Sequence, residues 1–285
     1  MPPTPSPTPA TRARLRGIRH VALDMDGTIY RGGTVFPWTG PFLARLRDLG
    51  IRWTFLTNNP SKSAADYLAH LGRMGIPASP DELHTSAQAT IGWLQRHRPA
   101  WRRLFVLGTP SMQAEFAAAG FLLAADDPAD APDAVVVAFD PTLTYARLGR
   151  AAWWIQQGKS YIATNPDRVC PTDQPTVLVD CGALCALLAS ATGREPEIVL
   201  GKPDPAMLDG ILARHGLRAD EVAMVGDRLY TDVLMAHRAG ALGVLVLSGE
   251  ATADEAAAAD PAPHLVLPTL AELGELLASA RSLPR

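Results

Sequence analysis

The sequence predicts an α/β fold in which a parallel-sheet core is interrupted by a second, inserted α/β domain. Short apolar runs alternate with longer segments of helical spacing, which is the pattern of parallel strand–helix–strand units. The 285 residues exceed one domain, since a domain usually holds about 150 residues. A second alternating series begins near Thr85, and from about residue 195 the pattern returns to that of the first block. We therefore expect a core of residues 15–84 and 195–285, with residues 85–194 inserted between its halves.

The composition is that of a globular protein with a real apolar core. Hydrophobic residues make up 47% of the chain, and the formal net charge of -3 offers no basic field for nucleic acid. No apolar run approaches the 18 residues or so of a membrane span, and three cysteines form no disulfide framework. The N-terminus lacks the apolar segment of a secretory signal, so we expect a soluble, cytoplasmic protein. Its Pro-rich residues 1–14 are predicted to be a disordered tail.

Each block divides into strands and helices by its apolar spacing. The first block predicts strands over residues 18–27 and 51–59 and helices over 40–50 and 61–75, the second helix capped by Ser61. The inserted series predicts strands over 103–108, 133–139 and 160–167 and helices over 86–97, 111–120, 144–158 and 181–193. The last block predicts strands over 196–204, 221–232, 240–249 and 263–270 and a helix over 205–216. On the helix over 181–193, Cys181 and Cys185 are expected to be buried thiols.

Four polar clusters follow predicted strands of the core. In open parallel sheets, ligands bind beyond the carboxyl ends of the strands, so neighbouring strands would bring these clusters to one crevice. Taken alone, each cluster also fits a plainer interpretation, such as a solvated turn or an acidic helix start. The clusters are Asp24 with Asp26, Thr57 with Asn58, Lys202, and Asp227 with Asp232.

The residue types in these clusters point to phosphoryl chemistry on a metal. Carboxylates are hard oxygen ligands, which suit Mg²⁺ better than Zn²⁺. Lys202, Thr57 and Asn58 offer hydrogen-bond donors, which suit a phosphate dianion. A divalent cation beside acids and phosphate donors favours phosphoryl transfer, in which an aspartate can attack phosphorus.

In their order along the chain, "DMDGTIY", "LTNN", "GKPDP" and "GDRLYTD" resemble the four motifs of the haloacid dehalogenase (HAD) superfamily. The resemblance is strongest to the NagD-like, p-nitrophenylphosphatase-like branch, whose type II (C2) cap is inserted between the second and third motifs. "ATNPD" and "CGALCALL" resemble the cap of that branch and its return to the core. The resemblance implies a Rossmann-like catalytic core, a substrate-selecting cap, and a Mg²⁺-dependent phosphatase of small phosphomonoesters such as sugar phosphates, nucleoside monophosphates and p-nitrophenyl phosphate.

The resemblance also implies a role for each motif residue. Asp24 would be the nucleophile and a metal ligand, and Asp26 the general acid/base, with its main-chain carbonyl on the metal. Asp227 would bind Mg²⁺, and Asp232 would support the metal site. The phosphoryl oxygens would be held by the backbone N–H groups of Met25 and Gly27 and by the side chains of Thr57, Asn58 and Lys202, the last also screening Asp24.

The cap would choose the substrate, and here the resemblance implies Asn165, Asp167 and Arg168. The segment "RVCPTDQPTVLVD" has no histidine and differs from the pattern of pyridoxal phosphate phosphatases, which favours other phosphomonoesters. Two further functions stay open, a non-catalytic phospholigand-binding or scaffold protein on the same fold and a phosphotransferase to an acceptor other than water. A small phosphorylated metabolite is the expected partner, and a homodimer stays open because caps of this branch often make dimer contacts.

Overall fold

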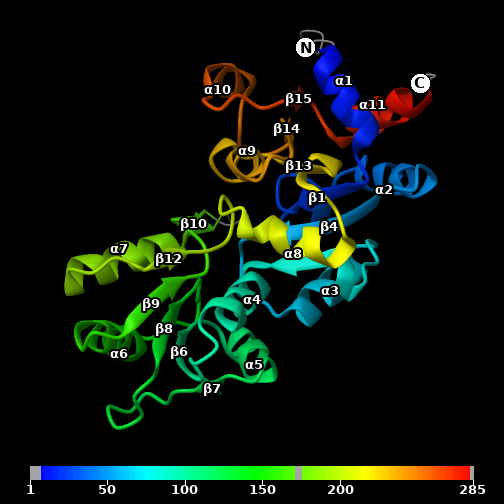
Figure 1. Ribbon diagram of the computed structural model, residues 1–285. Coiled ribbons are helices and arrows are strands. Elements are labelled where there is room, and N and C mark those ends of the chain that lie inside the picture. The colour runs from blue at the N-terminus through cyan, green and yellow to red at the C-terminus, as the bar shows by residue number, and fades with distance from the viewer. Residues whose placement is uncertain (1–7, 171–174, 283–285) are drawn as a thin grey trace. The chain divides into compact units, whose positions relative to one another are not determined.

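The computed structural model describes residues 8–170 and 175–282, which form two compact units (Figure 1). Of the described residues, unit 1 holds 8–56, 70–83 and 203–282, and unit 2 holds 57–69, 84–170 and 175–202. The sequence-based domain boundaries remain a prediction. Among the described helices, none is both long enough and apolar enough to cross a membrane.

Unit 1 is organised around a six-stranded parallel sheet, as the α/β prediction requires. Its strand order is β15-β14-β13-β1-β4-β5. The central strand β1 pairs in parallel with β13 on one side and β4 on the other. Every residue of β1 is buried, which fits a strand covered on both faces. The strands span β1 His20–Asp24, β4 Arg52–Thr57, β5 Leu83–Thr85, β13 Val222–Gly226, β14 Leu242–Val246 and β15 Leu265–Leu267.

Helices and a small hairpin complete the part of the chain around this sheet. The helices are α1 Pro9–Gly17, α2 Thr39–Asp48, α8 Ala206–His215, α9 Leu234–Ala239, α10 Ala253–Ala258 and α11 Leu270–Ser282. The hairpin is β2 Tyr30–Arg31 with β3 Thr34–Val35, and short 3-10 turns cover Pro80–Glu82 and Ala219–Glu221. A π-helical turn over Leu229–Val233 leads into α9.

Helix α1 corrects part of the prediction that residues 1–14 are a disordered tail. Pro9 stands in the first turn, where its missing N–H has no intrahelical acceptor to lose. The Thr8 hydroxyl caps the helix by accepting from the Thr11 N–H at 3.1 Å. Leu15 is buried, and Arg14 donates to the Gly240 carbonyl at 3.0 Å, so tertiary contacts hold this segment. Residues 1–7 lie outside the described residues.

Unit 2 is organised around a second parallel sheet of five strands, in the order β12-β9-β8-β6-β7. The strands are β6 Arg103–Leu107, β7 Leu122–Leu123, β8 Ala134–Val137, β9 Ser160–Ala163 and β12 Ile198–Val199. An antiparallel hairpin pairs β10 Val169–Cys170 with β11 Leu178–Val179. The helices are α4 Ser86–His97, α5 Pro110–Ala118, α6 Tyr145–Gln156 and α7 Cys181–Thr192, while α3 Ala64–Arg73 runs from unit 2 into unit 1. The sequence places the strand before Lys202 in the core, whereas β12 pairs with β9 of this second sheet.

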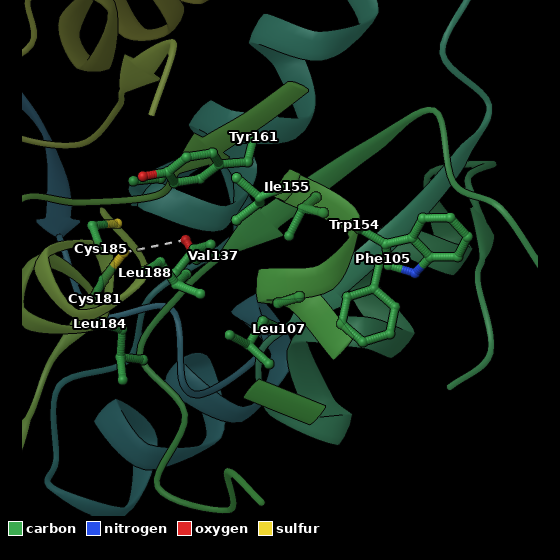
Figure 2. Close-up of a cluster of buried hydrophobic side chains, with 13 residues drawn as sticks. Phe105, Leu107, Val137, Trp154, Ile155, Tyr161, Cys181, Leu184, Cys185 and Leu188 are labelled. Carbon is green, nitrogen blue, oxygen red and sulfur yellow. Dashed lines mark hydrogen bonds between the residues drawn. The ribbon is translucent and has the colours of Figure 1, made fainter. Parts of the chain in front are cut away.

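Alternate side chains along the strands of unit 2 pack against different pairs of helices. Phe105 and Val137 belong to the cluster shown in Figure 2, which includes Trp154 and Ile155 of α6 and Leu188 of α7. Their strand neighbours Leu104 and Val136 belong to a cluster with α4 and α5 instead. Cys181 and Cys185 are buried free thiols, as the sequence predicts, and the Cys181 thiol donates to the Val137 carbonyl at 3.2 Å.

The start of α3 corrects one local prediction. The helix begins at Ala64, and the residue that caps it is Ser63 rather than Ser61. The Ser63 hydroxyl accepts from the Asp66 N–H at 3.2 Å, and the Ser63 N–H donates to the Asp66 carboxylate at 3.2 Å. This reciprocal pair is a capping box, which needs an acidic or amide residue three positions on. Ser61 instead donates its N–H to the Asn59 side chain.

Candidate active site

Three carboxylates gather at the carboxyl ends of two neighbouring strands of unit 1. Asp24 is the last residue of β1, Asp227 follows β13 directly, and Asp232 lies in the π-helical turn. Each offers a carboxylate oxygen, and the three oxygens lie within 4.8 Å of one another. The three residues are only 9%, 3% and 1% exposed, respectively. The structure thus brings together three of the four predicted metal residues in a buried cluster.

Glycines make the room that these carboxylates occupy. A Cβ atom on Gly249 would lie 1.9 Å from Asp227 Oδ2, and one on Gly226 would lie 2.2 Å from the Asp232 carboxylate. Gly27 has a φ of +83°, a conformation that L side chains rarely adopt, and a Cβ there would lie 2.3 Å from Asp227 Oδ2. Any larger residue at these positions would push a carboxylate out of the cluster.

The cluster is electrostatically costly without a cation. Burial and the charges of Asp24 and Asp232 raise the pKa of Asp227 to about 8. Asp227 Oδ2 accepts from the Glu250 N–H at 2.8 Å, whereas its Oδ1 is buried and has no hydrogen-bond partner among the described residues. Three carboxylates, one of which has an oxygen without a hydrogen-bond partner among the described residues, fit a divalent cation such as Mg²⁺.

Asp26 lies two residues after Asp24 and is exposed. Desolvation and the negative charge of Asp24 raise the pKa of Asp26 above its ordinary value. A carboxyl group that holds its proton more tightly than usual is suited to protonating a leaving group. The position and chemistry of Asp26 are therefore compatible with the acid/base role implied by the resemblance.

The role of the Gly27 N–H as a donor to phosphate remains a prediction, and the structure shows its present partner. The Gly27 N–H donates to the Tyr30 carbonyl at 2.8 Å, inside the turn that follows β1. Glycine is needed at this position because Asp227 approaches it closely. Met25 is buried next to it, and its role as a backbone donor to phosphate remains a prediction.

A second polar group lies in unit 2. Asn58 Oδ1 accepts from the Lys202 N–H at 2.7 Å, and Asn58 Nδ2 donates to the Lys202 carbonyl at 3.0 Å. Nδ2 also donates to Asp167 Oδ2 at 3.1 Å, so both of its protons are engaged. Asn58 therefore ties Lys202 and Asp167 together, and its side chain has no further proton to donate to a phosphate. Thr57, the last residue of β4, is buried, and its hydroxyl oxygen accepts from the Asn59 N–H at 3.1 Å.

Two family models match the chain. The model for a haloacid dehalogenase-like hydrolase matches residues 21–122, and the HAD-hydrolase-like model matches residues 199–273. The ribonucleotide monophosphatase NagD of Escherichia coli is 31% identical over 256 residues, which cover 90% of this chain and 98% of NagD. The chain belongs to the haloacid dehalogenase superfamily. It is a phosphatase of the NagD-like, p-nitrophenylphosphatase-like family.

Solved structures of this superfamily extend the likeness to the fold. A 4-nitrophenylphosphatase from Thermotoga maritima matches with a TM-score of 0.86 at 38% identity, over 92% of this chain and 98% of that one. A glycerol phosphate phosphatase from Mycobacterium tuberculosis, solved in complex with magnesium, matches with a TM-score of 0.85 at 32% identity, over 95% of this chain and 81% of that one. These matches confirm the predicted fold class of a parallel-sheet core and a separate parallel-sheet cap.

Sequence reasoning missed several residues that shape the haloacid dehalogenase site. The Thr28 hydroxyl donates to Asp24 Oδ2 at 3.2 Å, and the Arg228 N–H donates to Asp232 Oδ2 at 3.1 Å. Arg228 also pairs with Glu250 at 2.9 Å, next to the Glu250 N–H that binds Asp227. Thr28 and Arg228 each lie within five residues of a motif aspartate, which is the signal that could have found them.

The predicted specificity residues of the cap have different surroundings. Asn165 is fully buried, donates to Asp180 Oδ1 at 3.0 Å and accepts from the Thr164 hydroxyl at 2.9 Å. Its side chain therefore supports the loop from within, while Asp167 is half-buried and Arg168 is exposed. Residues 171–174 of the adjoining loop lie outside the described residues.

Proposed function

We propose that this phosphatase hydrolyses small phosphomonoesters with Mg²⁺ through a phospho-aspartyl intermediate on Asp24. The observation that carries the proposal is the buried cluster of Asp24, Asp227 and Asp232, with an unpaired carboxylate oxygen on Asp227. A protein that only binds a phosphorylated ligand does not need a further buried carboxylate beside the residues that would hold its metal. The magnesium complex of the glycerol phosphate phosphatase supports the choice of metal.

In the first half of the proposed reaction, Asp24 attacks the phosphorus atom of the ester. A bond forms between a carboxylate oxygen and phosphorus, while the bond from phosphorus to the ester oxygen breaks. Asp26 gives its proton to the departing oxygen, which leaves as an alcohol. The raised pKa of Asp26 supports this role because the carboxyl must be protonated when the substrate arrives.

In the second half, water completes the hydrolysis. Asp26, now a carboxylate, takes a proton from a water molecule that attacks the phosphorus atom. The bond to Asp24 breaks, inorganic phosphate is released, and both aspartates return to their starting forms. If an alcohol took the place of water at this step, the same residues would transfer the phosphoryl group instead.

Asp24, Asp227 and the main-chain carbonyl of Asp26 would hold Mg²⁺, with Asp232 supporting the site. When bound, the ion offsets the charges of the carboxylates and of the phosphate, so that Asp24 can approach an anionic substrate. We further propose that Lys202 and Thr57 bind phosphoryl oxygens. Asn58 then acts as a positioning residue, because its side chain binds both the N–H and the carbonyl of Lys202.

The substrate is proposed only as a class. The relatives include a ribonucleotide monophosphatase, a 4-nitrophenylphosphatase and a glycerol phosphate phosphatase, so their names span several leaving groups. Asp167 and Arg168 are the cap residues that we propose to contact the leaving group, since Asn165 is buried. A cytoplasmic location and a homodimer remain predictions.

The test is phosphate release from a panel of phosphomonoesters, measured with Mg²⁺ and again with EDTA. The panel holds nucleoside monophosphates, sugar phosphates, glycerol phosphate, pyridoxal phosphate and p-nitrophenyl phosphate. We expect release from at least one member in Mg²⁺ and its loss in EDTA. Absence of any Mg²⁺-dependent release would contradict the proposal and favour a binding protein. Product analysis with added glycerol would reveal transfer to an acceptor other than water.

A further inference from the structure

A cavity lies at the amino-terminal end of strand β4 in unit 1, away from the carboxylate cluster. It has a volume of about 560 Å³, within the size range of small-molecule sites. Arg52, which begins β4, lines it, and Arg52 pairs in register with His20 at the start of β1. Asp24 is at the other end of β1, about 13 Å away along the strand at roughly 3.3 Å per residue. The cavity is therefore separate from the phosphatase site.

Cations from three elements surround this cavity. Arg47 comes from α2, Arg52 from β4 and Arg214 from α8, and all three are exposed. Arg47 also lies over the indole of Trp53, with 5.7 Å from its guanidinium carbon to the ring centroid. Because the three guanidinium groups are carried by separate elements, a ligand that engages all of them needs more than one anionic group.

The two acids of the lining neutralise these cations only in part. The Glu82 carboxylate accepts from the Ser79 N–H at 2.8 Å and from the Ser79 hydroxyl at 3.1 Å, so it caps the turn that contains it. Asp81 lies 3.9 Å from the Arg214 guanidinium, a distance typical of a weak, exposed pair. The lining therefore has three cations and two acids, so its net charge is positive.

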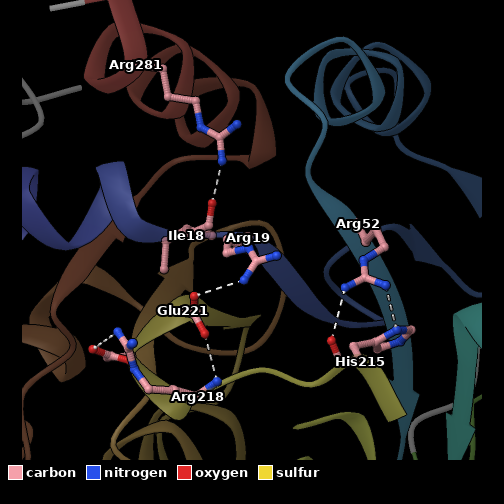
Figure 3. Close-up of polar contacts among 8 residues, drawn as sticks. Ile18, Arg19, Arg52, His215, Arg218, Glu221 and Arg281 are labelled. Carbon is pink, nitrogen blue, oxygen red and sulfur yellow. Dashed lines mark hydrogen bonds and ion pairs between the residues drawn. The ribbon is translucent and has the colours of Figure 1, made fainter. Parts of the chain in front are cut away.

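Two buried N–H donors of the lining have no acceptor within residues 8–170 and 175–282. The first is the indole N–H of Trp53, a residue that is only 8% exposed. The second is on His215, whose Nδ1 lies 3.1 Å from Arg52 Nη1 (Figure 3). A guanidinium can only donate, so His215 Nδ1 accepts and the proton of the neutral ring is on Nε2, which has no partner. Burial, together with the charges of Arg52 and Arg214, lowers the pKa of His215 and keeps the ring neutral.

We propose that this cavity binds a small organic anion that carries at least two carboxylate or phosphoryl groups. Such a ligand would supply negative charge for Arg47, Arg52 and Arg214. Three guanidinium groups on separate elements, with only two acids beside them, favour a ligand that carries more than one anionic group. The proposal does not depend on the phosphatase reaction.

The test is isothermal titration of the full-length, metal-free protein in HEPES buffer with pyrophosphate and, separately, with citrate. Without metal the carboxylate cluster repels anions, so binding there is suppressed. We expect saturable binding of at least one probe and none of glycerol, a neutral control. Binding of pyrophosphate alone would assign a phosphorylated ligand, and binding of citrate alone would assign a polycarboxylate.

Variants locate the binding. Arg52→Gln and Arg214→Gln should each weaken binding about tenfold or more, the effect expected from losing one charge-assisted hydrogen bond. Arg73→Gln, which changes an exposed arginine of α3 outside the lining, should bind like the parent protein. The proposal is overturned if neither probe saturates, if Arg52→Gln and Arg214→Gln bind normally, or if Arg73→Gln loses as much affinity. Circular dichroism of each variant checks that it is folded.

Discussion

The two ends of strands β1 and β4 carry opposite chemistry. At the carboxyl end of β1, Asp24 joins Asp227 and Asp232 in a buried cluster of acids. At the amino end, His20 is paired in register with Arg52, and the nearby charged groups are mostly exposed arginines. His20 is buried and shares a hydrogen bond of 3.0 Å with the Thr54 hydroxyl. Its ring lies against that of His215, with centroids 4.7 Å apart and planes tilted by 31°.

The two ends differ in the free-energy cost of placing their ionisable groups in the folded protein. Exposed arginines keep their hydration, so they cost little, and a buried histidine avoids the cost by staying neutral. Three buried carboxylates that share one site can neither keep their hydration nor easily become neutral. A bound cation is therefore needed to offset the repulsion among them. A buried cluster of like charges is therefore a strong sign of function, whereas the arginines become informative only with a cavity and unpaired donors beside them.

Substitution of Asp24 should have the largest effect on activity. Asp24→Asn preserves the size of the side chain but removes the nucleophile, so kcat for p-nitrophenyl phosphate in Mg²⁺ should fall by about 10⁴-fold or more. Asp48→Asn, an exposed aspartate at the end of α2, is the matched control and should keep full activity. Full activity in Asp24→Asn would show that the buried cluster is not catalytic, and the contrast between the two ends would lose its basis.

The space around the carboxylates gives the next effect. In Gly249→Ala the new Cβ would meet Asp227 Oδ2 at 1.9 Å, which must displace that carboxylate. We expect Mg²⁺ activation to need about 10–100-fold more metal, as is common when a supporting residue of a metal site is altered. Gly72→Ala, where a Cβ meets nothing within 4 Å, should leave metal dependence unchanged. Titrations of activity against Mg²⁺ concentration measure both, and equal curves would argue against a metal at Asp227.

A smaller effect is expected where a donor acts through another residue. Asn58→Ala removes the bonds to both the N–H and the carbonyl of Lys202, so kcat/KM should fall about tenfold, chiefly through a higher KM. Lys202→Gln should lower kcat/KM further. If Asn58 works only by positioning Lys202, the double variant should be no worse than Lys202→Gln alone. Fully additive losses would indicate that Asn58 acts on the substrate independently.

The sequence predicts most of the fold because its apolar periodicity is strong where the strands and helices are buried. The helix expected over 86–97 is α4 Ser86–His97, and buried strands such as β1 and β8 lie inside the expected ranges. The failures occur where tertiary contacts outweigh local preference. Helix α1 forms because Leu15 and Arg14 find partners elsewhere, and the short strand β12 joins the second sheet through its pairing with β9.

The candidate site follows the same rule. Asp24, Asp227 and Asp232 could be predicted because each lies in a motif near the end of a predicted strand, and the order of the motifs is visible in the sequence alone. The engagement of the Gly27 N–H with Tyr30, the saturation of the Asn58 amide and the burial of Asn165 depend on partners that only folding brings close. The importance of Gly249 could not be predicted from the sequence. It depends on the short distance between its Cβ position and the carboxylate of Asp227, more than 20 residues earlier in the chain.

The smallest expected effect tests the amino-terminal end, where His20 should be a source of pH-dependent stability. Burial, together with the neighbouring His215 and the positive charge of Arg52, lowers the pKa of His20 from 6.5 to about 3. Below pH 6.5 the unfolded chain therefore binds a proton that the folded protein does not. The stabilisation from His20 is complete above that pH and is lost as the pH falls toward about 3. Between pH 7 and 4.5 this would lower the free energy of unfolding by about 1–3 kcal/mol.

His20→Gln isolates this contribution, because glutamine can still hydrogen-bond Thr54 but does not titrate. Urea unfolding at pH 7 and pH 4.5 should show a smaller loss of stability on acidification for His20→Gln than for the parent protein. His97→Gln, an exposed histidine of α4, should lose as much as the parent. If His20→Gln and the parent lose equal stability, His20 is charged in the folded protein. The amino-terminal end would then carry a buried charge after all, and the two ends would differ only in its sign.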